Sequence, residues 1–228
     1  MDVDTTTSNS DLSASPAKKR GLSDIFWRLI GLKGMPGRGK LDVRVALLVG
    51  EAGLEHSKRI VNLLHKQSGI RVKLLKKELD LDADMASDEQ IKQASFVARN
   101  WLERAGGDLL IWGEAPLPST TLNLRFISAV ADKDDRPGAF GFTQTLHLPV
   151  DIKPELLPIL LLAIFAAMEC KDNEKAAKLH EGLNMALEEA MPILQALPAD
   201  LTTRERTAIQ FCAGKAIAKV AQMQASLD

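Results

Sequence analysis

From Asp42 the sequence alternates between two apolar periodicities, and this alternation constrains the fold more than any other feature. Residues 43–50 (VRVALLVG) and 70–76 (IRVKLLK) carry apolar side chains at every second position, which is typical of β-strands. Residues 54–69 and 87–107 carry them three or four positions apart and end in glycine, which is typical of amphipathic helices. The order strand, helix, strand, helix predicts right-handed βαβ connections between parallel strands.

Three more strand patterns follow without a helix between them. They are residues 108–114, 121–128 and 142–150, and the first two are separated by a loop that holds Pro116 and Pro118. Strands joined by short loops pair antiparallel, so we expect a mixed sheet with the element order βαβαβββ and helices packed on it. The fold class is therefore α/β (α+β).

Every pattern after Lys153 is helical. Residues 154–170 form an apolar run that tolerates prolines near its start, and residues 173–197 form a long amphipathic segment that Pro192 kinks or interrupts. Residues 201–224 form a final helix that Thr202 or Thr203 caps. We expect three parts: a basic tail (1–40), an α/β domain (41–150) and a helical region (151–228).

Composition restricts the class of protein. The 228 residues are 46% hydrophobic and 26% charged, with a net charge of −1, so the chain is long enough for a sizeable core and is not basic enough for nonspecific nucleic-acid binding. Cys170 and Cys212 lie far apart with no further Cys or His at metal-ligand spacing, which argues against a zinc site or a disulfide framework. We expect a cytoplasmic protein.

The tail has its own pattern. Residues 1–21 are rich in Ser, Thr and Asp and carry too little apolar surface to fold. Residues 22–34 (LSDIFWRLIGLKG) read as a short amphipathic helix with basic neighbours. Its apolar residues are Ile25, Phe26, Trp27, Leu29 and Ile30. Two alternatives stay open for this helix: contact with an anionic membrane surface, or docking on the protein's own fold or on a partner.

Residues 34–40 match all but the last position of the phosphate-binding pattern G-x-x-x-x-G-K-[ST], with Leu41 in place of the hydroxyl. A strand precedes the glycines in a true phosphate-binding loop, whereas here the strand follows the lysine. We interpret this stretch as a flexible tether.

One face of the predicted sheet is basic. If the apolar alternation faces the helices, the opposite face receives Arg44 and Glu114 together with four candidate ligand-binding residues: Arg71, Lys73, Trp112 and Arg125. Such a face is compatible with a sensor for a small ligand or single-stranded nucleic acid, although these platforms use several aromatic residues and this one offers a single Trp. The alternatives are a solvated face, or one covered by the C-terminal helices with Trp112 in the seam.

Other residue patterns that could indicate a metal site or a catalytic site are incomplete. His56 and His65 project from opposite sides of one helix, and Asp80, Asp82 and Asp84 lack the glycine and glutamate of a calcium loop. No G-x-S-x-G pattern occurs. We therefore expect no catalytic residue, no metal and no cofactor, and we expect that the protein is not an enzyme.

Two stretches suggest a family. Residues 98–115 (ARNWLERAGGDLLIWGEA) and 122–129 (LNLRFISA) resemble the N-terminal α/β domain of TolB-like proteins, over about residues 42–150. Residues 208–222 (AIQFCAGKAIAKVAQ) resemble the first helix of a tetratricopeptide unit, without its usual aromatic residues or a second copy at the repeat period. The resemblance implies a bacterial, non-catalytic scaffold or adaptor with a protein partner, with contact at the inner face of a membrane as an open alternative. It predicts no oligomeric state.

Overall fold

The computed structural model describes residues 40–80, 87–116, 120–130, 145–170 and 173–225. The described residues belong to one compact unit, and the boundary that we expected at residue 150 stays a prediction. The tail with its short amphipathic helix lies outside the described residues.

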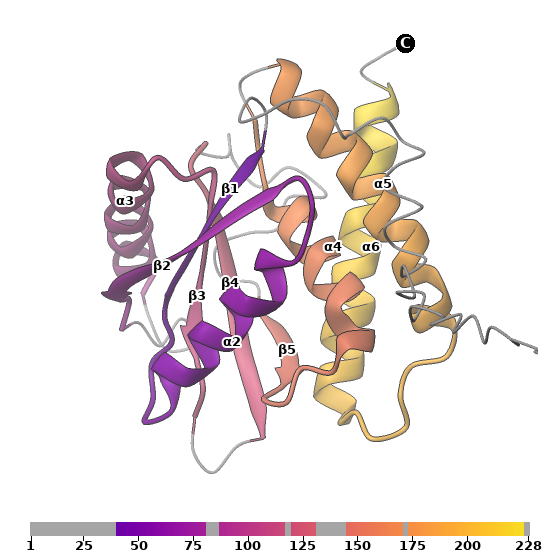
Figure 1. The fold of residues 1–228 in the computed structure, drawn as a ribbon, viewed down its shortest axis with the longest axis horizontal. Helices are drawn as coiled ribbons and strands as arrows, with labels where there is room; N and C mark the ends of the chain where they lie inside the picture. Colours follow the sequence, from indigo (N-terminus) through magenta and orange to yellow (C-terminus); the bar gives the residue numbers. More distant parts are fainter. Residues whose placement is uncertain (1–39, 81–86, 117–119, 131–144, 171–172, 226–228) are drawn as a thin grey trace, which may run out of the picture. The chain divides into compact units, whose positions relative to one another are not determined.

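A mixed sheet of five strands, in the order β2-β1-β3-β4-β5, forms the centre of this unit (Figure 1). The strands are β1 (Leu41–Leu47), β2 (Ile70–Glu78), β3 (Leu109–Glu114), β4 (Thr121–Ser128) and β5 (Leu146–Pro149). β1 pairs parallel with β2 and β3, whereas β4 pairs antiparallel with β3 and β5. The predicted class and element order are confirmed.

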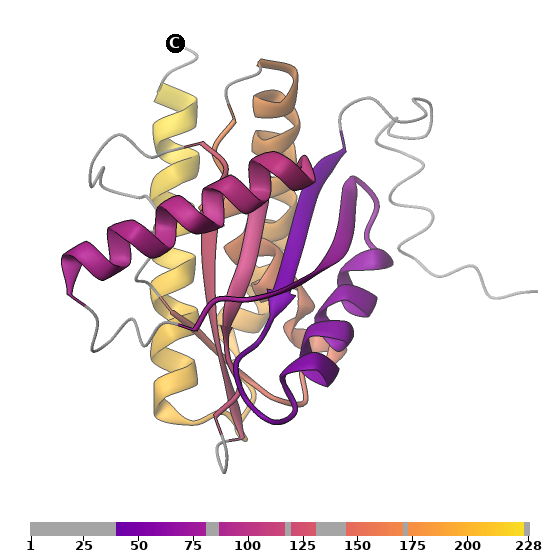
Figure 2. The ribbon, with the colours of Figure 1, turned by 90° about the vertical axis from the view of Figure 1, so that its left-hand side faces the viewer.

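Helices α2 (Gly53–His65) and α3 (Asp88–Ala105) cover opposite faces of the sheet. The strand order explains why: β2 lies on one side of β1 and β3 on the other, so two right-handed connections that run in opposite directions place their helices on opposite faces. Ile60 and Leu64 of α2 belong to the main core, whereas Ala98 and Leu102 of α3 belong to a second, smaller core. Figure 2 shows α3 in front of the sheet.

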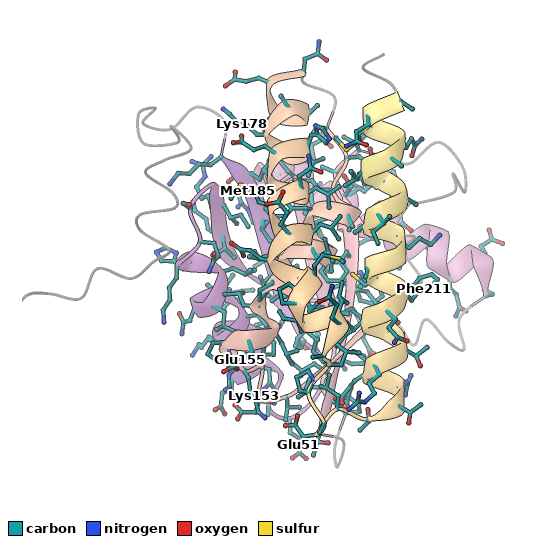
Figure 3. The ribbon with its side chains drawn as sticks, turned by 90° about the vertical axis from the view of Figure 1, so that its right-hand side faces the viewer. Glu51, Lys153, Glu155, Lys178, Met185 and Phe211 are labelled. Atoms are coloured by element: carbon teal, nitrogen blue, oxygen red, sulfur yellow. The ribbon has the colours of Figure 1, made fainter. Side chains whose placement is uncertain are left out.

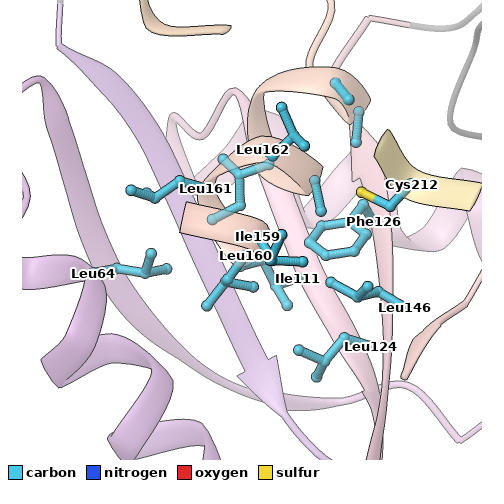
Figure 4. Packing of buried hydrophobic residues seen from close by; sticks show 14 of the residues in the cluster. Leu64, Ile111, Leu124, Phe126, Leu146, Ile159, Leu160, Leu161, Leu162 and Cys212 are labelled. Atoms are coloured by element: carbon cyan, nitrogen blue, oxygen red, sulfur yellow. The ribbon is translucent and has the colours of Figure 1, made fainter. Parts of the chain in front are cut away.

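The C-terminal part is helical, as predicted. It consists of a short 3₁₀ turn (Pro154–Leu156) and the helices α4 (Leu157–Ala167), α5 (Asn173–Gln195) and α6 (Thr203–Ala225). α4 is apolar on nearly every side because it lies between the sheet and the other two helices, where it contributes to the main core (Figure 4). Pro192 lies in the last turn of α5, and the helix continues past it to Gln195.

Capping residues begin two of the helices. The Ser87 hydroxyl accepts the backbone N–H of Gln90, whose side chain accepts the N–H of Ser87 in return, which is a capping box. Thr202 and Glu205 make the same reciprocal pair at the start of α6. Thr202 was one of the two predicted caps, and Glu205 three positions later was the available signal for the box.

Candidate functional site

The expected basic face of the sheet is not an open surface. Trp112 and Arg125 are each only 1% exposed. Trp112 belongs to the core that α3 covers, and the Arg125 guanidinium carbon lies 5.4 Å from the centre of the Trp112 ring. Arg125 also donates a hydrogen bond to the Glu114 carboxylate at 3.1 Å. These side chains form a buried cation–π contact and ion pair, so of the alternatives for this face the solvent-facing stacking surface does not hold at Trp112 and Arg125.

The covering helix also differs from the expected one. We considered a seam between this face and the C-terminal helices, but α3 covers Trp112, and α4 and most of α6 pack in the core on the opposite face. Only the first turn of α6 reaches this face, at the β4–β5 edge. Sequence periodicity identifies the two sides of a strand, whereas the side that a given helix takes depends on the order of strands in the sheet. The strand order was not readable from the sequence.

Arg71 and Lys73 lie apart from Trp112 and Arg125. They belong to the edge strand β2, and β1 separates them from β3 and β4. Arg71 donates from Nε and Nη2 to the two carboxylate oxygens of Asp42, at 2.7 and 2.6 Å, while Lys73 is exposed. The four predicted ligand-binding residues therefore divide into two pairs and do not make one site.

Asp42 is the centre of an ion-pair network at the start of β1. It also contacts the Arg44 guanidinium at 3.3 Å, and its backbone N–H donates to the Asp108 carboxylate, which accepts from Lys175 at 2.7 Å. Burial acts to raise the pKa of Asp42, but the hydrogen bonds and positive charge of Arg71, followed by Arg44, outweigh it and hold the pKa below its ordinary value. Each of the two carboxylates is paired with at least one cation, so the network joins β1, β2, the residue before β3 and α5 structurally.

A row of polar side chains crosses β3, β4 and β5 on the same face as Trp112. Glu114 lies opposite Asn123, and Asn123 lies opposite His147. Arg204 of α6 donates from Nε to His147 Nε2 at 3.1 Å; since a guanidinium has only donors, Nε2 accepts and Nδ1 carries the proton. His147 Nδ1 then donates to the amide oxygen of Asn123 at 2.8 Å. The sequence does not indicate either partner of His147, and the structure gives this histidine a structural role.

The row ends at a buried carboxylate. Glu205 is 2% exposed and accepts hydrogen bonds from Thr121 and from both the backbone and the hydroxyl of Thr202. His147 and Glu205 thus attach the first turn of α6 to β5 and β4. Across the described part of the chain, no group of three or more His, Cys, Asp or Glu side chains is arranged to hold a metal. The row holds elements together, and its titratable groups are engaged in doing so.

The carboxyl ends of β1 and β3 meet where the strand order reverses, which is the usual ligand position in open α/β sheets. Here the backbone fills that position. Val49 donates to the Gly113 carbonyl at 2.9 Å and accepts from Ala115 at 2.8 Å, which extends the pairing beyond the strands. Gly50 has φ +124°, and a Cβ atom there would lie 2.5 Å from the Ala115 oxygen. Even a methyl group has no room between these two backbones.

Both cysteine side chains lie in environments that favour the neutral thiol over the thiolate. Burial raises the pKa of Cys212 to about 12. The pKa of Cys170 is raised to about 11, first by burial and then by the negative charge of Asp108. Thiolates are the reactive form of cysteine, so neither environment favours a nucleophile.

Large apolar side chains are exposed on four helices: α2 and α5 carry one each, Leu54 and Met191, whereas α3 and α6 carry two each. On α3 these are Phe96, which is 67% exposed, and Val97, whereas on α6 they are Phe211 and Ile217, which are 47% and 49% exposed. Figure 3 looks onto α5 and α6 and labels Phe211. Exposed apolar groups that gather on one helix face are typical of interaction surfaces.

Comparison with known proteins leaves the family open. No family model, curated protein or solved structure matches the chain. The resemblance to TolB-like domains and tetratricopeptide helices therefore stays a prediction.

The predicted membrane or partner contact at Ile25, Phe26, Trp27, Leu29 and Ile30 falls outside the described residues, as does most of the glycine-rich tether. Within the described residues, no helix combines the length and the apolar content that crossing a bilayer requires.

Proposed function

We propose that the protein is a non-catalytic interaction module, a scaffold or adaptor, that binds another protein chain through the outer face of α6. The supporting observation is that none of the exposed residues of this helix from Thr207 onward is charged; Lys215 is half-buried at the margin of the face, with its ammonium 5.4 Å from the centre of the Phe211 ring. We define the outer face of α6 by its exposed residues from 207 onward: Thr207, Gln210, Phe211, Gly214, Ile217, Ala218, Ala221, Gln222, Gln224 and Ala225.

Other surface helices of the protein differ from α6 in this respect. The exposed side of α2 includes Glu55, Lys58 and Arg59, and that of α5 includes Glu188 and Glu189. A helix that faces water on one side normally places its charges there, while a helix with few charges on any side is normally buried.

The inner side of α6 is already occupied. Ile209, Cys212, Ala213 and Ala216 are buried in the main core. Lys219 is buried as well, with its ammonium at the end of α4. Packing within this fold therefore does not explain why the outer face has so few charges. Contact of this face with a second protein surface would explain it.

The polar groups support the non-catalytic part of the proposal. Among the described residues, the histidine, carboxylates and guanidinium of the polar row bind one another and the helix start, and the usual ligand position of the sheet is filled by backbone. The TolB-like and tetratricopeptide-like resemblance agrees with an adaptor role but is itself part of the proposal.

Site-specific photo-crosslinking tests the proposal in the native cell. The full chain carries p-benzoylphenylalanine in place of Ile217, or, as a matched control, in place of Leu54 on α2, which is also 49% exposed. We expect covalent adducts with a protein from position 217 and not from position 54. Equal yields at the two positions, or none at either, would contradict a binding surface on α6.

A further inference from the structure

The first turn of α6, residues 203–206, is attached to the sheet by polar contacts, unlike the rest of the helix. β5 lies beside this end of α6 (Figure 1). From Ile209 onward the inner side of α6 is buried in the main core, and Leu201 is buried just before the helix. Between these two apolar residues the one buried side chain is the carboxylate Glu205. Segments with few buried apolar contacts open at a lower free energy than their neighbours, so we expect this turn to open more easily than the rest of α6.

His147 joins this turn to β5 in its neutral form. Arg204 donates from Nε to His147 Nε2 at 3.1 Å, so the lone pair of Nε2 is the acceptor. Nδ1 carries the ring proton and donates to the amide oxygen of Asn123 at 2.8 Å. Both ring nitrogens are therefore engaged, and an added proton must go to Nε2.

A proton on Nε2 is incompatible with the Arg204 contact. It removes the lone pair that accepts the hydrogen bond, and it places one N–H group and one positive charge against another. Histidine is the side chain whose ordinary pKa, about 6.5, allows such a change near neutral pH. From this geometry we propose that His147 is a pH-sensitive switch: uptake of a proton at Nε2 releases Arg204 and opens the first turn of α6.

The other charged groups near this end of β5 are bound elsewhere. The strand packs mainly against β4 and α6. Arg125 of β4 is paired with Glu114 on β3, two strands away from His147. Glu205 accepts its hydrogen bonds from β4 and from the residue before α6, and Arg206 donates to two backbone carbonyls. In the described part of the chain, Arg204 is therefore the charge that directly opposes a proton on the ring.

The sign of the pH effect follows from counting protons. With the turn closed the ring is neutral, whereas with the turn open it is a solvated histidine that binds a proton below about pH 6.5. The open state thus binds more protons at acid pH, so acidification favours opening. Between about pH 7.5 and pH 5.5 the equilibrium constant for opening should rise about tenfold.

Amide hydrogen exchange of the full chain, followed by NMR, measures this opening. The probes are the backbone N–H of Glu205, which donates to the Thr202 hydroxyl, and that of Arg206, which donates to the Thr202 carbonyl at 3.0 Å. Their protection factors, which are corrected for the intrinsic pH dependence of exchange, should fall about tenfold from about pH 7.5 to pH 5.5. The amide of Cys212, in the buried part of the same helix, should change by less than about twofold.

Two histidine variants locate the effect. His147→Gln provides a carbonyl that can accept from Arg204 but takes up no proton in this range, so protection of the first turn should no longer depend on pH. His180→Gln changes a half-buried histidine of α5, whose Nε2 lies 3.2 Å from the Asn184 amide nitrogen, and should keep the wild-type dependence. A full tenfold fall in His147→Gln would overturn the proposed switch.

Arg204→Ala separates a switch from a purely structural contact. Without the guanidinium the closed state can hold a protonated ring, so the first turn should be less protected than in the wild type at about pH 7.5 and nearly equally protected at about pH 5.5. An equal loss of protection at both pH values would mean that the contact between His147 and Arg204 is structural only.

The ring itself gives a measurement that needs no variant. Nitrogen-15 NMR of the His147 side chain in wild-type protein should show the neutral Nδ1–H tautomer at about pH 7.5. An Nε2–H tautomer, or wild-type protection factors that stay constant down to about pH 5.5, would overturn the inference. The inference does not rest on the proposed function, which the photo-crosslinks from position 217 test separately.

Discussion

The ammonium of Lys219, on α6, lies 2.9 Å from the carbonyl oxygen of Ala166, in the last turn of α4. It also donates to the carbonyl of Met168 and, at 2.8 Å, to the carboxylate of Glu169. One buried lysine thus satisfies backbone acceptors that the end of α4 would otherwise leave unpaired.

Replacing this lysine should be costly. Lys219→Ala leaves two buried carbonyls without their donor, and we expect a loss of about 2–4 kcal/mol in the free energy of unfolding. Lys215→Ala, one turn earlier on the same helix, should change the free energy by less than about 0.5 kcal/mol. Urea denaturation of both variants measures the difference. Equal midpoints would show that the Lys219 contacts do not stabilise the fold.

The Asp42–Arg71 pair should affect stability at low pH. Because the pKa of Asp42 is lowered in the folded protein, its contribution is present above the unfolded-state pKa and is lost as the pH falls through the folded-state pKa. Arg71→Ala removes the main opposing charge, so the acid-unfolding midpoint should move to higher pH.

Lys73→Ala is the control for Arg71→Ala, since Lys73 is an exposed cation two residues along the same strand. Its acid-unfolding curve, followed by circular dichroism, should match that of the wild type. A shift as large as that of Arg71→Ala would indicate a general loss of positive charge and not the specific pair.

The thiols should react slowly in the folded protein. With pKa values of about 12 for Cys212 and about 11 for Cys170, the thiolate is a small minority at pH 8. We expect Ellman's reagent to label both cysteines promptly in guanidinium chloride and neither within minutes under native conditions. Rapid labelling of a native thiol would mean that its environment is more open than described.

Trp112 should be a major stabilising residue and not a ligand contact. Trp112→Ala removes a large side chain from the core under α3, with an expected cost of about 3–5 kcal/mol. Phe96→Ala removes an aromatic side chain of α3 that is 67% exposed, and it should lower the free energy of unfolding by less than about 0.5 kcal/mol. Thermal denaturation of the pair tests this, and similar melting temperatures would refute the burial argument.

The sequence was most informative where a pattern is local. Alternation in residues 43–50 and 70–76 correctly identified strands, and the glycine at residue 106 ends α3 in a left-handed conformation, as the pattern of a helix stop indicates. Thr202 could be recognised as a cap because its partner lies three residues away. Each of these signals depends on neighbours within one or two turns of chain.

Contacts between distant segments could not be read in this way. His147 and Arg204 lie 57 positions apart, and nothing in either local pattern indicates the other. The burial of Trp112 depends on which side of the sheet α3 takes, and this depends on strand order. Alternation separates the two faces of a strand but does not indicate which element covers each face.

The close approach of Gly50 and Ala115 limits how this scaffold can be redesigned. The obstacle at the carboxyl ends of β1 and β3 is main chain, so no exchange of side chains would install a cofactor pocket there. A designer would have to lengthen the segment between Val49 and Gly53 and sacrifice two backbone hydrogen bonds before any ligand could enter.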